Sequence, residues 1–249
     1  MRPIATTPFT SSSTRSHNRE LLALILLVSF FSKWMLQVSI FGVHGYWDTG
    51  YSLFSRLADN FLATGALVLD WDHTMYRGGN TYASRPPLFP LLIVSTKFLF
   101  HHSAPAFVLV QTFLSTMSVL LVYQITVRIS NASAALTAAF FYAFHPYALV
   151  HDTQLQETAL YNFLSLASVT LVLISISRKQ TLNFVVTGFV LGLTTLTRAS
   201  HLVHSLALAM TLGLLLKPKS LAIRSAIALF FGLMLCLSPW LIRNKMKVG

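Results

Sequence analysis

The sequence predicts an all-α polytopic membrane protein. Of its 249 residues, 54% are hydrophobic and only 10% are charged, and the mean hydropathy is +0.64. A soluble domain has about 25% charged residues, so this composition excludes a soluble globular class. Apolar runs long enough to cross a bilayer as helices recur along the chain, which indicates several transmembrane segments.

The charge distribution predicts about seven transmembrane helices, plus interfacial (juxtamembrane) helices in a first outside loop at residues 44–104. With the N-terminus in the cytoplasm, the basic residues of short loops fall inside, and every acidic residue after Glu20 falls outside. If residues 88–100 also crossed, the basic residues at 178–179 and 217–219 would move outside, against the positive-inside tendency. We therefore place residues 88–100 at the interface. The expected spans are residues 21–43, 105–127, 132–150, 158–177, 182–197, 201–216 and 222–242.

In chain order, a flexible, Ser- and Thr-rich cytoplasmic tail at residues 1–20 is expected to precede a transmembrane module at residues 21–249. Lys33 lies inside the first apolar run, so one face of that helix is expected to contact protein or water rather than lipid. Residues 49–64 place apolar and polar side chains on opposite faces of a helix, and Gly65 is a natural helix stop. This helix is expected to lie in the membrane interface.

The net charge of +11 would suggest a nucleic-acid partner in a soluble protein. Here the basic residues lie mostly in short loops, where they set topology, and no nucleic-acid motif occurs. We therefore predict no nucleic-acid partner. The single cysteine, Cys236, lies in an apolar run, so an intrachain disulfide is excluded.

Asp48 is the first acidic residue after the first apolar run. Charge at a membrane boundary is costly unless it is capped, paired or used. Two roles fit this position. The carboxylate could serve in catalysis, or it could be the N-cap of a helix that begins at Thr49.

Several short motifs follow one another along the chain. They are an acidic residue after the first helix, a basic-Pro-Pro-apolar motif, an acidic residue that opens a later helix, Gly-Leu-x-x-Leu-Thr-Arg, and Pro-Trp-x-x-Arg-Asn. The motifs lie at Asp48, residues 85–88, Glu157, residues 192–198 and residues 239–244. Their order resembles the GT-C membrane glycosyltransferases, in particular the dolichyl-phosphate-mannose protein mannosyltransferase and aminoarabinose transferase branch (glycosyltransferase 39/83-like). The family commonly has an acidic pair after the first helix, whereas Thr49 follows Asp48 here.

This resemblance implies a GT-C-like module that moves a sugar from a polyprenyl-phosphate-linked donor at the outer or lumenal membrane face. Asp48 would be the catalytic base that takes the acceptor proton. Arg85 would bind the donor phosphate, and Glu157, Arg198 and Arg243 would be further substrate-binding residues. Each has a simpler explanation. The arginines could anchor to lipid headgroups, and the glutamate could stabilise a helix N-terminus.

The expected partners are the donor, an acceptor that is a protein, a lipid or a glycan, and membrane lipids. No cofactor and no metal site are predicted, because the histidines lack metal-ligand spacing. The resemblance leaves a divalent cation open. The expected location is the plasma or inner membrane of a bacterium, or the endoplasmic reticulum of a eukaryote.

Two alternatives to an enzyme stay open. The chain ends at Gly249, soon after the last motif, whereas family members continue, so it is expected to be the N-terminal module alone or a truncated reading frame. It could then be a non-catalytic membrane subunit. A transporter is disfavoured, because charge gathers at one face of the membrane and only Lys33 lies deep.

Overall fold

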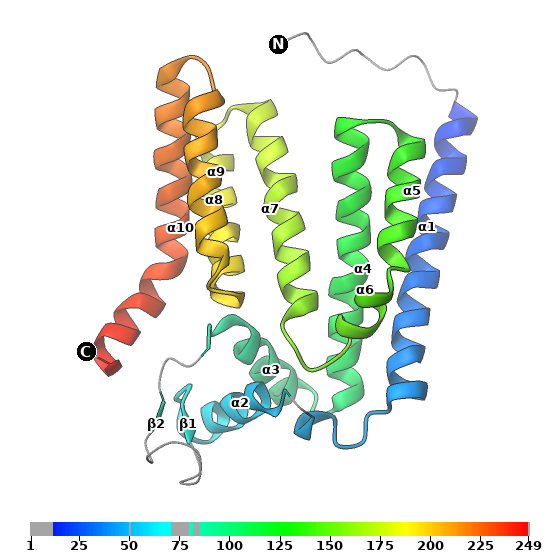
Figure 1. Ribbon diagram of the computed structural model, residues 1–249, viewed down its shortest axis with the longest axis vertical. Helices are drawn as coiled ribbons and strands as arrows, with labels where there is room; N and C mark the ends of the chain where they lie inside the picture. Colours follow the sequence, from blue (N-terminus) through cyan, green and yellow to red (C-terminus); the bar gives the residue numbers. More distant parts are fainter. Residues whose placement is uncertain (1–11, 50, 71–79, 82–84, 249) are drawn as a thin grey trace.

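A computed structural model gives the architecture, and it describes residues 12–49, 51–70, 80–81 and 85–248. Most of the described chain is helical (Figure 1). The α-helices are α1 (Ser12–Met35), α2 (Ser52–Thr64), α3 (Leu88–Leu99), α4 (Ala104–Ile129), α5 (Ala132–Ala143), α6 (Pro146–His151), α7 (Thr158–Arg178), α8 (Thr181–Thr197), α9 (His201–Leu215) and α10 (Lys219–Val248). The shorter elements are a π-helical turn η1 (Leu36–Phe41), a 3₁₀ turn η2 (Tyr46–Asp48) and the strands β1 (Leu69–Asp70) and β2 (Asn80–Thr81).

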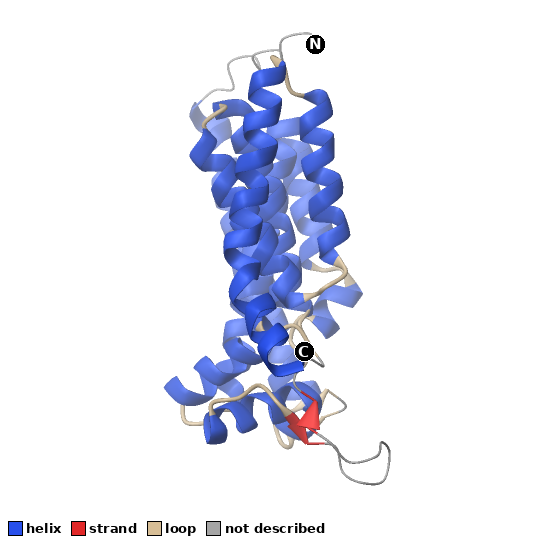
Figure 2. Cartoon of the chain, turned by 90° about the vertical axis from the view of Figure 1, so that its left-hand side faces the viewer, coloured by secondary structure: helices blue, strands red, loops and turns tan. Residues whose placement is uncertain are grey.

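The long helices run side by side, and α2, α3 and the two short strands lie across one end of the bundle (Figures 1 and 2). Among the described helices, four are long and apolar enough to cross a membrane, namely α1, α4, α7 and α10. This confirms the polytopic membrane class. The other three expected spans correspond to α5, α8 and α9, which have 12, 17 and 15 residues. At 1.5 Å per residue a 12-residue helix covers about 18 Å, short of the ~30 Å hydrocarbon core.

The expected span at residues 132–150 is not one helix, so that prediction was wrong. Helix α5 ends at Ala143, and α6 begins at Pro146. Proline disfavours helical geometry in the residue before it, and His145 is accordingly extended, with φ −62° and ψ 126°. At the start of the chain, α1 begins at Ser12, inside the expected tail, and residues 1–11 lie outside the described residues.

The two interfacial helices are present close to their predicted bounds. Helix α2 begins at Ser52 rather than at residue 49, and it ends where Gly65 adopts φ 71° and its N–H binds the carbonyl of Phe61. Helix α3 ends at Leu99, one residue before the predicted bound. The apolar face of α2 packs toward α3, where the rings of Phe54 and Phe89 meet edge to face at 5.0 Å.

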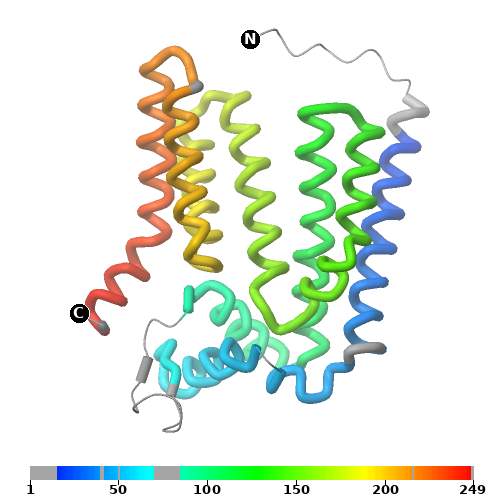
Figure 3. Tube along the Cα trace, viewed as in Figure 1, coloured from blue at the N-terminus to red at the C-terminus, as the bar shows by residue number. Residues whose placement is uncertain are grey.

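Strands β1 and β2 follow α2 and pair antiparallel, with Leu69 opposite Thr81. The other end of the chain approaches the same region, because α10 contains Pro239, which removes a helical hydrogen bond. Figure 3 shows the last part of α10 bending away from the bundle axis beyond the main body of the helix. The bend places the Pro-Trp-x-x-Arg-Asn motif beside the interfacial helices.

Helices α8 and α10 approach each other closely at glycines. A Cβ at Gly188 would lie 1.9 Å from the carbonyl oxygen of Leu229, and a Cβ at Gly232 would lie 2.0 Å from that of Val185. Small residues allow such backbone approach in membranes, where packing rather than water exclusion drives helix association. The backbones of α8 and α10 are therefore closely packed against each other.

We expect Gly188→Ala to destabilise the protein by about 1–3 kcal/mol, because its methyl group overlaps backbone that a rotamer change cannot move. The matched control is Gly213→Ala in α9, where an added Cβ meets nothing within 4 Å. Alanine gains up to about 1 kcal/mol of helix propensity over glycine there. Melting temperatures in detergent measure both, and equal melting temperatures would contradict the packing argument.

Candidate active site

The predicted catalytic carboxylate lies on the 3₁₀ turn η2. The backbone N–H of Asp48 donates to the carbonyl of Gly45 at 2.8 Å, which closes the turn. The side chain of Asp48 is exposed, whereas Tyr46 is only 3% exposed. The turn therefore presents a carboxylate to water while the residues before it are held by the protein.

Tyr46 holds the turn against residues 153 and 154, which lie between α6 and α7. Its hydroxyl donates to the carbonyl of Thr153 at 2.6 Å and accepts from the side-chain amide of Gln111 at 2.9 Å. The Gln111 amide also donates to the carbonyl of Gln154 at 2.5 Å. Burial raises the pKa of Tyr46 far above its usual value, so its hydroxyl stays protonated and keeps donating.

Trp47 holds the same turn against the interfacial helices. Its indole N–H donates to the carbonyl of His102 at 2.9 Å, and the ammonium of Lys97 lies 4.4 Å from the indole ring centroid. Lys97 is 3% exposed, and it donates to Ser55 Oγ at 2.8 Å and Asp59 Oδ1 at 2.8 Å. A cation over an indole face is a favourable contact, so Lys97 connects the turn with α2 and α3.

The N-cap interpretation of Asp48 is wrong. Helix α2 begins at Ser52, its N-cap residue is Tyr51, and no side chain caps it. Asp48 belongs to the separate turn η2, so it lies too far upstream to accept from the first helical N–H groups. The exposed carboxylate is thus available for another role.

A cavity of about 280 Å³ lies beside this turn. Tyr46 and Thr49, on either side of Asp48, both line it, and so does Gln154 from the segment between α6 and α7. The full lining is Gln37, Gly42, His44, Tyr46, Thr49, Tyr51, Gln154 and Leu155. Its size is near the lower limit of about 300 Å³ for ligand pockets.

A larger groove of about 620 Å³ lies between α2, α3 and the ends of α8 and α10. Its lining is mostly apolar, and Arg243 and Lys247 are its basic residues. The guanidinium of Arg243 donates to the carbonyl of Leu67 at 2.8 Å and lies 4.6 Å from the ring centroid of Trp240. The lining residues are Phe61, Thr64, Gly65, Ala66, Leu67, Pro87, Leu91, Leu196, Cys236, Pro239, Trp240, Arg243 and Lys247.

The other predicted site residues lie at two further places. Arg85 is exposed, and its guanidinium lies 5.8 Å from the ring centroid of Phe54. Glu157 and Arg198 form an ion pair at 2.9 Å, and Arg198 also lies 4.7 Å from the ring centroid of Tyr161. Hence Glu157 binds Arg198 in this structure. In the described part of the chain, no group of three or more His, Cys, Asp and Glu side chains could hold a metal ion.

A protein-family comparison decides the membership of the chain. The family described as dolichyl-phosphate-mannose-protein mannosyltransferase matches residues 84–242, more than half of the sequence. The chain belongs to this family. A search of curated proteins gives no match.

Solved structures of an oligosaccharyltransferase from Archaeoglobus fulgidus have a similar fold. The apo crystal structure aligns with a TM-score of 0.70 and 15% identity, over 92% of this chain and 30% of that one. A second structure, of the same protein tethered to an acceptor peptide containing the NVT sequon, aligns with a TM-score of 0.59 and 12% identity, over 94% and 35%. This mannosyltransferase-family chain thus spans about a third of those proteins and shares a GT-C fold with them.

Sequence analysis missed the residues that position the turn in this family member. Gln111 and Lys97 lie in apolar stretches, and each is buried with its polar group bound to a distant segment. A polar side chain inside an apolar run is costly without a partner. The position of Gln111 and Lys97 in such runs was therefore the one indication in the sequence that they bind other polar groups. It could not have named the partners, which are more than 35 residues away along the chain.

We expect Lys97→Met to destabilise the protein by about 1.5–3 kcal/mol, because charge-assisted hydrogen bonds are lost. The effect should fall near the lower end of this range, because the half-exposed Asp59 regains water when its partner is removed. Tryptophan emission should also shift, since Trp47 loses the cation over its ring. Lys219→Met, at an exposed position in α10, is the matched control. An unchanged melting temperature in Lys97→Met would show that Lys97 does not hold the turn.

Proposed function

We propose that this chain is a membrane glycosyltransferase that moves a sugar from a polyprenyl-phosphate-linked donor to an acceptor at the outer or lumenal face. One observation carries the proposal. Asp48 is exposed on a turn whose two preceding residues are anchored, and a cavity lies beside that turn. Preorganisation of this kind is what a reacting group needs to meet its substrate in a fixed geometry.

The chemistry requires one base and one anion-binding region. The acceptor heteroatom forms a bond to the anomeric carbon of the sugar while the bond from that carbon to the phosphate oxygen breaks. Asp48 takes the acceptor proton, and the carrier leaves as a phosphate anion. Basic side chains stabilise the charge that develops on the leaving phosphate.

The groove between α2, α3 and α10 fits the donor. A polyprenyl chain is apolar and a phosphate is anionic, and the groove combines a mostly apolar lining with Arg243 and Lys247. Pro87 of the basic-Pro-Pro motif also lines it, which places the backbone of that motif at its edge. We assign phosphate binding to Arg85 and Arg243, and we keep Glu157 and Arg198 as proposed substrate-binding residues.

The direct test is transfer itself. The purified chain is reconstituted in liposomes with radiolabelled dolichyl-phosphate mannose and a detergent extract of membrane acceptors. The proposal expects loss of label from the lipid and its appearance in acceptor. Intact donor with a folded protein would favour the non-catalytic subunit instead.

For Asp48 we expect Asp48→Asn to lower turnover by about 10²–10⁴-fold, because the amide cannot accept the proton. Asp48→Ala should behave alike, and both should keep the wild-type melting temperature, since the carboxylate caps no helix. Glu20→Gln, an exposed acidic residue of α1, is the control. Normal turnover in Asp48→Asn would remove Asp48 from catalysis.

For Arg85 we expect Arg85→Ala to weaken binding of a fluorescent polyprenyl phosphate. Loss of one charge-assisted contact costs about 1.5–3 kcal/mol, or roughly 10- to 150-fold in Kd. Arg56→Ala, another exposed arginine, on α2, is the matched control. Equal affinities of the two folded variants would exclude Arg85 from the phosphate site.

A further inference from the structure

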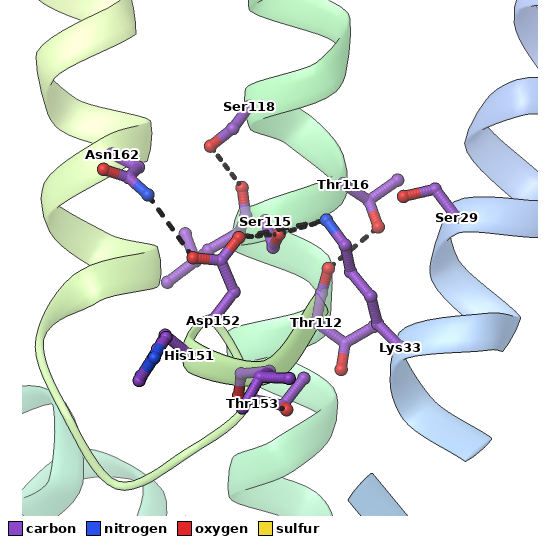
Figure 4. A network of polar contacts seen from close by, with 12 residues as sticks. Ser29, Lys33, Thr112, Ser115, Thr116, Ser118, His151, Asp152, Thr153 and Asn162 are labelled. Atoms are coloured by element: carbon purple, nitrogen blue, oxygen red, sulfur yellow. Dashed lines mark hydrogen bonds and ion pairs between the residues drawn. The ribbon is translucent and has the colours of Figure 1, made fainter. Parts of the chain in front are cut away.

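Lys33 and Asp152 form a fully buried ion pair inside the bundle. Lys33 Nζ lies 3.8 Å from Asp152 Oδ2, and both side chains are 0% exposed. Figure 4 shows the ammonium reaching from α1 toward the aspartate, which lies just after α6. Of the two expected environments of Lys33, protein or water, the structure shows protein, and its partner comes from a segment more than a hundred residues away.

Two further helices bind the same aspartate. Lys33 donates to Ser115 Oγ of α4 at 2.5 Å, and Ser115 in turn donates to Asp152 Oδ2. Asn162 of α7 donates to Asp152 Oδ1 at 3.3 Å. The carboxylate thus accepts hydrogen bonds from α4 and α7 and forms an ion pair with α1, as the dashed contacts in Figure 4 show for these side chains. These contacts fix the position of the chain at Asp152, between α6 and α7.

Thr153, the residue after this aspartate, contacts the turn that carries Asp48. The carbonyl of Thr153 accepts from the hydroxyl of Tyr46, and Thr153 Oγ1 donates to Gln37 Oε1 at 3.1 Å. The next residue, Gln154, lines the cavity beside Asp48. The side chain of Asp152 is therefore fixed in the buried network, and the carbonyl of the next residue, Thr153, fixes the turn η2.

The stability of the bundle alone does not require a charge at this position. Apolar residues of similar volume often replace a buried ion pair without loss of stability. Hydrogen bonds from α4 and α7, together with the ion pair to α1, by contrast set the depth and orientation of the backbone that carries Asp152. We propose that Lys33 and Asp152 are a positioning pair that holds Thr153 where Tyr46 can bind it, and so fixes Asp48 and the cavity wall. The catalytic part of this inference rests on the proposed function, and the geometric part does not.

Hydrogen exchange of the folded protein tests the geometric part. Lys33→Met/Asp152→Leu removes both charges, so no unpaired charge remains. We expect amide exchange to accelerate about tenfold or more in residues 43–49 and 153–157, with little change in α8 and α10. Wild-type exchange in both segments of the folded double variant would overturn the proposal.

Two further variants distinguish the loss of this positioning from a general loosening of the bundle. Ser175→Ala/Thr187→Val removes a buried hydroxyl contact of 3.0 Å between α7 and α8. It should leave residues 43–49 and 153–157 protected from exchange. Tyr46→Phe breaks the last link alone, so it should release residues 43–49 and leave residues 153–157 protected. Acceleration of both segments in the Ser175→Ala/Thr187→Val variant would contradict the proposal. If the charge-free variant does not fold, Ser115→Ala is measured in its place and judged by the same two segments.

Turnover with dolichyl-phosphate mannose tests the catalytic part. A misplaced base lowers kcat and leaves donor binding in its own groove intact, so we expect a fall of about tenfold in kcat at constant KM for the donor. A changed KM with constant kcat would overturn this part. If the wild-type chain transfers no sugar, the proposed function fails, and the exchange experiment still decides the positioning role.

Discussion

The hydroxyl of Tyr46 is the contact on which the candidate site of this protein depends. It donates to the carbonyl of Thr153 and accepts from Gln111, so it joins η2, α4 and the segment between α6 and α7 at one buried point. A buried hydroxyl without partners would cost several kcal/mol, roughly 2–7 by transfer estimates. Because both of its hydrogen bonds are made inside the protein, the turn that carries Asp48 has little freedom to leave its place.

Two kinds of packing divide the bundle. In α8 and α10, glycines bring the backbones together, and buried apolar residues such as Leu229 and Leu233 surround the contact. Helices α1, α4 and α7 also pack through apolar residues, but a polar network centred on Asp152 joins them as well. Close apolar packing favours a rigid frame, whereas a polar network specifies the orientation of the groups that it binds. The candidate site lies next to this polar network.

The cavity beside Asp48 and the groove beside α10 differ in chemistry, because different elements line them. The cavity beside Asp48 is small and is formed by loop segments whose backbone groups need water or partners. The groove beside α10 is larger and mostly apolar, because most of the side chains that α2, α3 and α10 contribute to its lining are apolar. Such a division suits a donor with an apolar chain and an acceptor that arrives from water.

The sequence by itself determined the membrane class, the two interfacial helices, the stop at Gly65 and the family motifs. These depend on local periodicity, backbone preference and short motifs, which are written in consecutive residues. It also predicted that the face of the first helix with Lys33 contacts protein or water rather than lipid. Only the tertiary structure decided that the partner of Lys33 is Asp152, that Glu157 binds Arg198, and that Asp48 caps no helix. Those outcomes depend on which distant segments the folded bundle brings within about 4 Å, and no local pattern records such a choice.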